Sequence, residues 1–397
     1  YPTDNQQDSL MDMSQIAHSV QAIMEAVPAP PWIGSNSWVL SPKKTKSGQV
    51  MLMNDTHIAY AQPSVWYEAH IETPDFSLYG NHLAGIPFAQ VGHTRDMAWG
   101  FTMLENDDID LYREKINPEN SNQVWENDHW QTMQVRKETI EVKGGENIDF
   151  EVKSTRHGVL INEVLPLVES EKSPISFSWT YTKFIAKSLE ANYKIARSKN
   201  VTDVQEAASM VHAPGLNLMY GDKKGNIAWL ALAKLIKRPK HVNPKVILDG
   251  ASGKDEILGY YDFSENPSSI NPPSGYIYSA NNQPDTVNGV LHSGYYIPEY
   301  RAKRILDYLK EDKKFSVADM KTMMNDNIYM LSYKERTGFV FDKKSFEQIN
   351  QFSYPTEGWG MTSTENTLIM SDGTHIIRFM DPENFSEIRQ IEVYDQN

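Results

Sequence analysis

The sequence predicts an α+β protein whose helices pack on sheets, and three observations favour this fold class. First, short apolar runs alternate with Gly and Pro over residues 38–112, which is the spacing of consecutive strands. Second, helical patterns appear after residue 185, with strand-like runs between them. Third, short strands repeat beyond about residue 330 with a period near 40 residues, as β-propeller blades do. Strands in front and helices behind predict a layered domain.

The first predicted element is a helix over residues 5–27. Apolar side chains recur there near a 3.6-residue period, at Leu10, Met13, Ile16 and Val20. A proline cluster ends this helix, at Pro28, Pro30 and Pro31. We expect the residues that follow to form a short exposed linker, which is the usual environment of a processing site.

Five strands are predicted next, and they cover Trp38–Leu40, Val50–Met53, Val65–Ile71, Pro87–Val91 and Met97–Thr102. Four helices follow, at Ile185–Ser198, Thr202–His212, Glu299–Lys310 and from Ser316 onward. The second of these helices has a Thr202-x-x-Gln205 capping box, and the last opens with Ser316-x-x-Asp319.

The C-terminal repeat aligns residues 340–349 with residues 379–388 at an offset of 39. Within one copy, Leu368–Ser371 and His375–Phe379 are joined through Asp372-Gly373, which predicts a hairpin. Two copies cannot close a propeller of four or more blades. We therefore expect a propeller-like fragment at the C-terminus.

Composition excludes several classes of function. The chain has 397 residues, and 38 basic against 52 acidic side chains give a formal net charge of −14, so nucleic acid is not an expected partner. The absence of cysteine excludes disulfides, thiol catalysis and thiolate metal sites. No apolar run approaches the roughly 18 residues that span a bilayer. The start at Tyr1, without an initiator Met or a signal sequence, suggests a processed chain or a fragment.

Gly34-Ser35 carries the most informative chemistry. A serine hydroxyl is a weak nucleophile at neutral pH, but an α-amine on the same residue, with a reference pKa of about 7.7 to 8.0, is a base within reach of it. Cleavage of the Gly34–Ser35 bond would therefore give one residue both nucleophile and base. The ordinary alternative is that the Gly-Ser pair is only a loop entering a strand.

Several separated motifs give this dipeptide a family context. They are, in order, Gly34-Ser-Asn-Ser-Trp-Val, Met53-Asn-Asp-Thr-His57, Trp66-Tyr-Glu, Gly92-His-Thr-Arg-Asp-Met-Ala-Trp-Gly100, Asn106-Asp-Asp-Ile-Asp-Leu-Tyr112, Asn271-Pro-Pro-Ser-Gly-Tyr-Ile, Ala280-Asn-Asn-Gln-Pro284 and Tyr300-Arg-Ala-Lys-Arg-Ile305. With these motifs, the chain resembles the penicillin acylase family of N-terminal-nucleophile hydrolases, which includes acyl-homoserine-lactone acylases, over about residues 32–325.

The resemblance implies an αββα sandwich, truncated here, and an amide hydrolase. Its substrate would be a small N-acyl compound, such as an acylated β-lactam nucleus or an N-acyl-homoserine lactone. It also implies a bacterial periplasmic or secreted protein with no organic cofactor. By the same resemblance, Ser35 is the nucleophile and Gly34-Ser35 the autocatalytic cleavage point. His57 stands where the family has Gln or His, and it would orient the freed amine of Ser35. Without the resemblance, His57 would be an ordinary polar residue at a strand end.

The family pattern also supplies donors for a tetrahedral oxyanion, each of which typically contributes about 2.7 to 4 kcal/mol. Asn281 matches the side-chain donor, and the backbone N–H of Met103 matches the second. Arg301 matches an arginine that positions a polar group of the substrate or holds Asn281. The ordinary alternatives are a turn at Asn281-Asn282 and, for Arg304, a solvated basic helix face.

A structural calcium site is also implied by the resemblance. Hard oxygens alternate in Asp107-Asp108-Ile109-Asp110, which suits Ca²⁺ rather than a transition metal. The family ligands match Asp107, the carbonyl of Ile109, and Asp110. The family draws a further ligand from its α subunit, and Asp285 is a poor substitute for a later one. The alternative is a solvated acidic turn.

The chain departs from the family at both ends. An α subunit should precede it, so residues 1–34 are interpreted as the end of that subunit or a spacer, and residues 35–329 as the β-subunit core. Residues 330–397 instead resemble the β-propeller type of glutaminyl cyclotransferase, through Thr337-Gly-Phe-Val-Phe-Asp and Tyr354-Pro-Thr-Glu-Gly-Trp-Gly360. In that family the residue matching Trp359 lines the substrate pocket.

Three hypotheses for function follow. The leading one is an amide hydrolase with Ser35 as an N-terminal nucleophile. The second is a non-catalytic fragment or binding module that lacks its α subunit. The third is cyclisation of N-terminal glutamine by the tail, motivated by Glu357-Gly-Trp359-Gly.

Overall fold

The computed structural model describes residues 32–58, 62–165, 168, 171–321, 327–331, 336–342, 348–356, 360–364, 367–371, 374–382 and 384–393. The predicted helix over residues 5–27 lies outside the described residues. The chain divides into two compact units, residues 1–314 and 315–397, and each is described by itself.

The centre of the first unit is a pair of sheets. A three-stranded antiparallel sheet has the order β2-β1-β21, formed by β1 (Trp32–Leu40), β2 (Met51–Ile58) and β21 (Tyr276–Ser279). It packs against a seven-stranded sheet with the order β20-β16-β15-β6-β5-β4-β3. These strands are β3 (Trp66–Thr73), β4 (Phe76–Leu83), β5 (Ala89–His93), β6 (Met97–Met103), β15 (Leu216–Asp222), β16 (Ile227–Leu232) and β20 (Ser268–Ile270).

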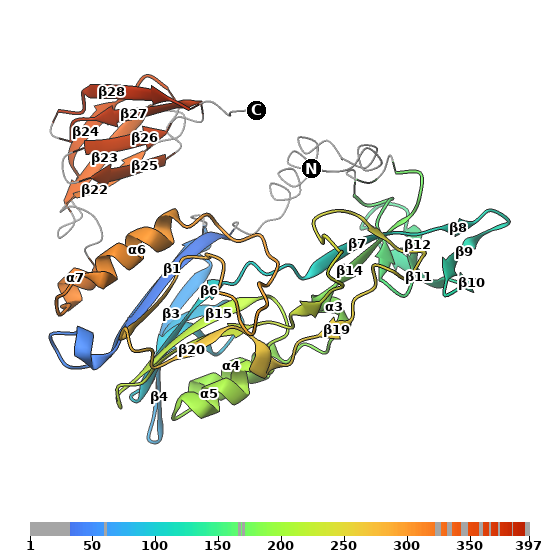
Figure 1. Ribbon diagram of the computed structural model, residues 1–397, viewed down its shortest axis with the longest axis horizontal. Helices are drawn as coiled ribbons and strands as arrows, with labels where there is room; N and C mark the ends of the chain where they lie inside the picture. The colour runs from blue at the N-terminus through green and yellow to red at the C-terminus, as the bar shows by residue number, and fades with distance from the viewer. Residues whose placement is uncertain are drawn as a thin grey trace. The chain divides into compact units, whose positions relative to one another are not determined.

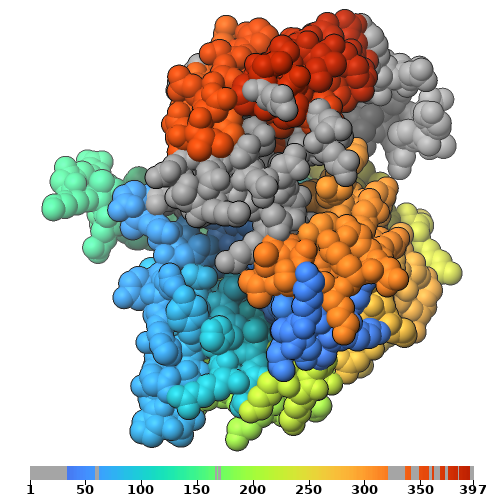
Figure 2. Space-filling view, turned by 90° about the vertical axis from the view of Figure 1, so that its left-hand side faces the viewer, coloured from blue at the N-terminus to red at the C-terminus, as the bar shows by residue number. Residues whose placement is uncertain are grey.

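Helices cover the outer faces of this pair. The helices α4 (Ser188–Arg197) and α5 (Val201–Ala208) pack on the seven-stranded sheet, and α6 (Tyr300–Lys310) lies against β21 (Figure 1). In the space-filling view, the orange segment that includes α6 lies directly against the blue N-terminal strands (Figure 2). The order of layers is therefore helix, sheet, sheet, helix, as the resemblance to N-terminal-nucleophile hydrolases implied.

Strand β15 shows why the layers form. Its side chains alternate between two buried environments, as a strand covered on both faces requires. Leu218 and Tyr220 pack in the cluster beneath α4 and α5, whereas Met219 packs between the two sheets with Val39 and Ile277. Full burial of such a side chain contributes about 1.5–3 kcal/mol. Asn217 shares the inter-sheet face with Met219 because it lies two residues away along the strand.

A further sheet extends the first unit (Figure 1). It has the order β11-β12-β13-β14-β7-β18, and it consists of β7 (Ile109–Arg113), β11 (Gln134–Ile140), β12 (Ile148–Ser154), β13 (Val159–Leu160), β14 (Ile175–Trp179) and β18 (Leu248–Asp249). Shorter elements are the strands β8 (Ile116–Asn117), β9 (Asn120–Glu126), β10 (His129–Thr132), β17 (Ile236–Lys237) and β19 (Gly259–Tyr260), the helix α3 (Thr180–Lys183), and 3₁₀ turns at Pro42–Lys44 and Phe263–Glu265.

Several element bounds differ from the predictions. The helix predicted at Thr202–His212 is α5, but its N-cap is Asn200, whose side chain accepts a hydrogen bond from the Asp203 N–H at 3.0 Å. The predicted Thr202 capping box was therefore wrong, because the earlier Asn is itself a strong N-cap. The helix predicted from Ile185 begins at Ser188, and Ile185 is 83% exposed, so it has no apolar partner to hold a further turn. The prediction for Glu299–Lys310 is confirmed by α6.

The described residues of the second unit form two antiparallel sheets and the short helix α7 (Val317–Lys321). One sheet is formed by β22 (Asn327–Leu331), β23 (Thr337–Asp342) and β24 (Gln348–Ser353), and the other by β25 (Gly360–Thr364), β26 (Thr367–Ser371), β27 (Ile376–Met380) and β28 (Glu387–Glu392). The predicted hairpin is confirmed by the pairing of β26 with β27.

The 39-residue repeat has a structural counterpart. The pairing of β23 with β24 shifts register between Val340 and Phe341, and that of β27 with β28 shifts between Phe379 and Met380. The two irregularities lie 39 positions apart, on equivalent residues of the two copies. These features are consistent with repeated units, but a propeller stays a prediction.

Candidate active site

Ser35 lies inside a strand and is fully buried, with 0% of its surface exposed. Strand β1 runs between β2 and β21, and Ser35 is opposite Thr56 of β2. The expectation of an exposed linker therefore does not extend to this dipeptide. The strand begins earlier than its apolar residues indicated, because pairing with β2 continues to residue 32.

Gly34 is required by both backbone conformation and space. Its φ is +151°, in the region that favours glycine, and the register between β1 and β2 shifts just before it, between Trp32 and Gly34. A Cβ added at Gly34 would lie 3.1 Å from the Arg301 guanidinium, 3.3 Å from Asn281 Oδ1 and 3.4 Å from His57 Nδ1. The residue before Ser35 is thus enclosed by the side chains that surround the serine.

Two donors converge on the Ser35 hydroxyl. The Met103 backbone N–H donates to Ser35 Oγ at 3.2 Å, and Asn281 Nδ2 donates to the same oxygen at 3.1 Å. The Ser35 backbone N–H in turn donates to Asn281 Oδ1 at 2.7 Å. Met103 N–H and the Asn281 amide are the two donors that the family pattern predicted for an oxyanion.

The fold explains why Met103 has free backbone groups for this purpose. Met103 is the last residue of β6, and on one side it pairs with Leu216 of β15. On the other side, β5 pairs with β6 only at Ala98 and Trp99. The later part of β6 therefore directs its N–H and C=O groups at side chains of the site instead of at a neighbouring strand.

Asn281 has its amide orientation set by four contacts. Its φ is 62°, a left-handed conformation that Asn tolerates better than most residues, and it is 0% exposed. Its Nδ2 donates to Ser35 Oγ and, at 2.9 Å, to the Met103 carbonyl. Its Oδ1 accepts from the Ser35 N–H and, at 2.9 Å, from Arg301 Nη2. Both donors and both acceptor sites are used, so only one orientation of the amide fits.

Arg301 ties the start of α6 to the serine. Its Nη1 donates to the Ser35 carbonyl at 2.7 Å and to Asn36 Oδ1 at 2.5 Å. Burial lowers the pKa of Arg301 from its ordinary value, while the nearby carboxylates of Asp55 and Glu105 oppose that effect. Arg304, one turn further along α6, is exposed, as a solvated helix face predicts.

His57 lies opposite Gly34 in the register of β1 and β2. Its Nε2 is 3.0 Å from Asp55 Oδ2 and 3.2 Å from Asn36 Nδ2. The hydrogen bond from His57 is the main reason that the pKa of Asp55 lies below its usual range. The Ser35 N–H bonds to Asn281 in the continuous chain, so the predicted contact of His57 with a freed amine stays a prediction.

Sequence reasoning missed four polar residues that complete this site. Asn36 and Asp55 form the group around His57, and a signal was present because each lies one or two positions from a predicted residue. Asn217 and Thr102 form a buried group next to Met103. No local sequence pattern identified this group, because its two members are 115 residues apart in the sequence.

Two of the predicted calcium ligands, Asp107 and Asp110, lie close to the guanidinium of Arg238. Arg238 Nε donates to Asp110 Oδ1 at 3.1 Å, and its Nη2 lies 3.6 Å from Asp107 Oδ1 and donates to the Asp107 carbonyl at 3.3 Å. Burial raises the pKa of both carboxyl groups, and Arg238 opposes that rise. Ile109 begins β7, opposite Trp179.

Two carboxylates and one carbonyl fall short of the six to eight oxygens that calcium takes. Within the described residues, no group of three or more His, Asp or Glu side chains is placed to hold a metal ion. The calcium site stays a prediction that requires further ligands. Glu357 and Trp359, singled out for the tail, lie outside the described residues. Among the described residues, no helix combines the length and apolarity needed to cross a bilayer.

Two family models match this chain. The penicillin amidase family model matches residues 2–352, and the glutamine cyclotransferase model matches residues 311–397. Acyl-homoserine lactone acylase QuiP of Pseudomonas aeruginosa is 28% identical over 316 residues, covering 77% of this chain and 37% of the relative. Penicillin acylase 2 proenzyme of Pseudomonas sp. is 28% identical over 306 residues, covering 74% of this chain and 38% of the relative.

A solved structure of thermostable penicillin G acylase from Alcaligenes faecalis matches with a TM-score of 0.65 and 28% identity, covering 73% of this chain and 51% of that chain. The chain thus spans less than two fifths of the length of the two curated relatives given above. The family model covers most of the chain, and the matching solved structure supports the same fold. This chain belongs to the penicillin amidase family.

Proposed function

We propose that this chain carries the catalytic centre of an amide hydrolase whose nucleophile is Ser35, freed as an N-terminal residue by cleavage of the Gly34–Ser35 bond. One observation carries the proposal: the Met103 N–H and Asn281 Nδ2 both meet Ser35 Oγ, at 3.2 and 3.1 Å. A carbonyl carbon attacked by Oγ would place its developing oxyanion close to the same two donors. The acylase names of two relatives support the same reaction class.

The reaction has two steps. Ser35 Oγ attacks the carbonyl carbon of the N-acyl substrate, and the Ser35 amine accepts the hydroxyl proton. The Met103 N–H and Asn281 Nδ2 hold the tetrahedral oxyanion, which then collapses to an ester as the substrate amine leaves with a proton. Water attacks that ester, the serine is regenerated, and a carboxylic acid is released. Arg301 holds Asn281 and the Ser35 carbonyl in place throughout.

We propose small N-acyl compounds, such as acylated β-lactam nuclei or N-acyl-homoserine lactones, as the substrates. The names of the relatives support both classes without choosing between them. A preceding α subunit would complete the acyl-binding pocket. The proposed bacterial periplasmic or secreted location rests on family membership alone, and fractionation of the producing cells tests it.

Processing provides the direct test of the nucleophile. We expect the full chain to yield a species that begins at Ser35, detected by N-terminal sequencing and intact mass, and to hydrolyse penicillin G or N-octanoyl-homoserine lactone. Ser35→Ala should remain uncleaved and inactive, since it lacks the attacking oxygen. Ser37→Ala is the matched control, because Ser37 is equally buried two residues along β1 but its hydroxyl donates to the Met53 carbonyl. An uncleaved parent chain, or an active Ser35→Ala variant, would overturn the proposal.

The alternative is a non-catalytic fragment or binding module. The observation in its favour is that the chain spans 37% of the length of a curated relative. Processing without turnover, restored by adding a preceding α subunit, would support that alternative for the isolated chain. Glutaminyl cyclotransferase activity of the tail stays a prediction.

A further inference from the structure

A buried polar group lies next to Met103 and contacts its backbone carbonyl. Its centre is Asn217 of β15, which is 2% exposed and faces the space between the two sheets. Asn217 Nδ2 lies 3.1 Å from the Met103 carbonyl, 3.0 Å from Thr102 Oγ1 and 3.2 Å from Ser279 Oγ. Two amide hydrogens thus serve three acceptors, all of which are in or next to the site.

The group joins the two sheets at this point. Thr102 belongs to β6 of the seven-stranded sheet, and Ser279 belongs to β21 of the three-stranded sheet. Their hydroxyl oxygens are 2.7 Å apart, and both residues are buried. Ser279 lies two residues before Asn281, so the same group touches the strands that deliver both proposed oxyanion donors. Displacing Asn217 would loosen Met103 and Asn281 relative to each other.

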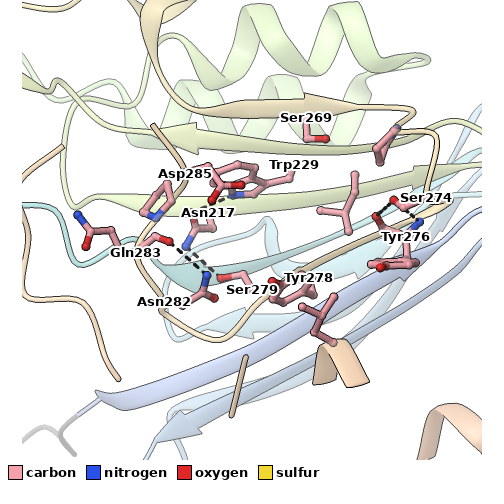
Figure 3. A pocket seen from close by; sticks show the side chains of 14 residues that line it. Asn217, Trp229, Ser269, Ser274, Tyr276, Tyr278, Ser279, Asn282, Gln283 and Asp285 are labelled. Atoms are coloured by element: carbon pink, nitrogen blue, oxygen red, sulfur yellow. Dashed lines mark hydrogen bonds between the residues drawn. The ribbon is translucent and has the colours of Figure 1, made fainter. Parts of the chain in front are cut away.

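Trp229 sets the orientation of the Asn217 amide. The indole Nε1–H of Trp229 donates to Asn217 Oδ1 at 2.9 Å. Because this contact fixes the oxygen, the amide nitrogen must point at Met103, Thr102 and Ser279. Asn217, Trp229 and Ser279 also line a cavity of about 330 Å³, in which the three side chains are seen together (Figure 3).

We propose that Asn217, oriented by Trp229, is a positioning residue that holds the Met103 backbone against Ser35. The proposal rests on the proposed function, since it gives Asn217 a task in the same reaction. The Met103 carbonyl accepts from both Asn217 and Asn281, and the N–H of the same residue donates to Ser35. A residue held by its carbonyl from two directions has little freedom to move its N–H. Misplacement of a catalytic group by about 1 Å can cost about 100-fold in rate.

The test compares Asn217→Ala with a matched buried asparagine. Asn266 is 4% exposed, and its Nδ2 donates to two backbone carbonyls, those of Ala231 and Ala233, at 2.9 and 2.8 Å. Ala231 lies opposite Asn217 in the pairing of β15 and β16, so Asn266 supports the same strand, but none of its hydrogen bonds among the described residues goes to Ser35, Met103, Asn281 or Arg301. In the full chain, we expect Asn217→Ala to lower kcat about 10- to 100-fold and to change KM less than about threefold. Asn266→Ala should lower the melting temperature comparably and leave kcat within about twofold.

A second variant guards against a folding defect. Trp229→Phe keeps the aromatic side chain and Asn217 but removes the donor to Asn217 Oδ1. We expect it to lower kcat about three- to tenfold with KM unchanged. A kcat within twofold of the parent in both Asn217→Ala and Trp229→Phe would overturn the proposal. An equal loss of kcat in Asn266→Ala would overturn it as well.

Amide hydrogen exchange separates this proposal from the proposed function. The Met103 N–H should exchange faster in Asn217→Ala and Trp229→Phe than in Asn266→Ala, whether or not the protein hydrolyses amides. Unchanged exchange at Met103 would overturn the positioning role. An inactive parent chain, or an active Ser35→Ala variant, would instead overturn the proposed function and leave the exchange result to decide this inference.

Discussion

A few single residues define the environment of the buried Ser35. Ser35 is held by contacts from Met103, Asn281 and Arg301, all of which occupy distant positions in the sequence. The family pattern predicted these partners, but it did not predict how tightly they are joined. Gly34 is the clearest case, because its environment turns a common Gly-Ser dipeptide into one with a specific steric requirement.

The substitution Gly34→Ala tests this steric requirement. We expect Gly34→Ala to slow cleavage of the Gly34–Ser35 bond at least about tenfold. An L-residue is strained at φ +151°, at a cost of about 1–3 kcal/mol, and its Cβ would press on the Arg301 guanidinium. The rate is followed by intact mass during expression or refolding. Gly48→Ala is the control, because Gly48 also has positive φ but has open space around it. Equal cleavage rates in the two variants would contradict the steric explanation.

Elements far from Ser35 carry a second polar group, which spans β7, the turn between β12 and β13, and a later loop. The buried His157 lies with Nδ1 2.7 Å from Glu114 Oε1 and Nε2 2.9 Å from Glu256 Oε1, and its ring stacks on Tyr112 with centroids 3.8 Å apart. Burial by itself lowers the pKa of His157, but the hydrogen bonds to the two carboxylates outweigh it, and the net pKa is raised. For Glu256, burial raises the pKa, but His157 and Arg156 together lower it to about 2.

These pKa shifts predict a pH dependence of stability. A raised histidine pKa stabilises the folded chain fully below pH about 6.5, and this contribution is lost as the pH rises through the folded-state pKa. A lowered glutamate pKa stabilises above pH about 4.5, and that contribution is lost as the pH falls toward 2. We therefore expect the contribution of this group to be largest between pH about 4.5 and 6.5.

Thermal unfolding of the full chain between pH 5 and 9 measures this effect. The decline in melting temperature above pH about 6.5 should be smaller in His157→Gln, which cannot become protonated. His241→Gln is the control, because His241 is exposed and contacts only Asp255 among the described carboxylates. If His157→Gln and the parent chain decline in parallel, the group does not control alkaline stability.

Helices and strands were predicted correctly where local residues determine where they begin and end. They were missed where pairing with a distant strand determines this. The helix α6 and the Ser316–Asp319 start of α7 follow from local patterns, and Ser316 Oγ does accept from the Asp319 N–H at 3.2 Å. Strand β4 was missed, because polar residues and Gly80 interrupt its apolar pattern. Its position between β3 and β5 depends on pairing that no single window of sequence contains. Asn281 was predicted from a family motif. Asn217 was not predicted, because its contacts come from distant parts of the sequence and it lies in no such motif.

At the scale of the whole molecule, the chain combines two units with separate cores. The first unit places Ser35 between two sheets, and the second has its own cluster around Phe352, Leu368 and Met370. The two family models overlap over residues 311–352, which include the boundary between the units at residues 314 and 315. The predicted domain boundary at residues 329 and 330 lies 15 residues after this division, because it was placed where the short C-terminal repeat begins.

A calcium ion at Asp107 and Asp110 would need ligands from more than one part of the protein, because calcium takes six to eight oxygens. Binding requires Asp107 and Asp110 to exchange Arg238 for the cation. We expect Ca²⁺ added to the EDTA-treated full chain to raise its melting temperature, since a ligand at 100 times its Kd stabilises the folded state by about 2.7 kcal/mol. Asp110→Asn should abolish the increase.

Asp108→Asn is the matched control, because the Asp108 carboxylate faces the Trp179 indole N–H at 3.4 Å. It should retain the increase. The same increase with Mg²⁺ would mean that the site does not select calcium, and no increase with Ca²⁺ would mean that Arg238 is the permanent counter-ion of this segment.

The large sequence separation between Arg301 and Ser35 affects the order in which the site can form during synthesis. The contact from its guanidinium to the Ser35 carbonyl joins residues 266 positions apart, and the Asn281 contact joins residues 246 apart. A ribosome that has reached residue 102 has already incorporated Ser35 but none of Met103, Asn281 and Arg301. Ser35 can meet all three partners only after the chain has emerged past residue 301, so its final surroundings form only once α6 has been made.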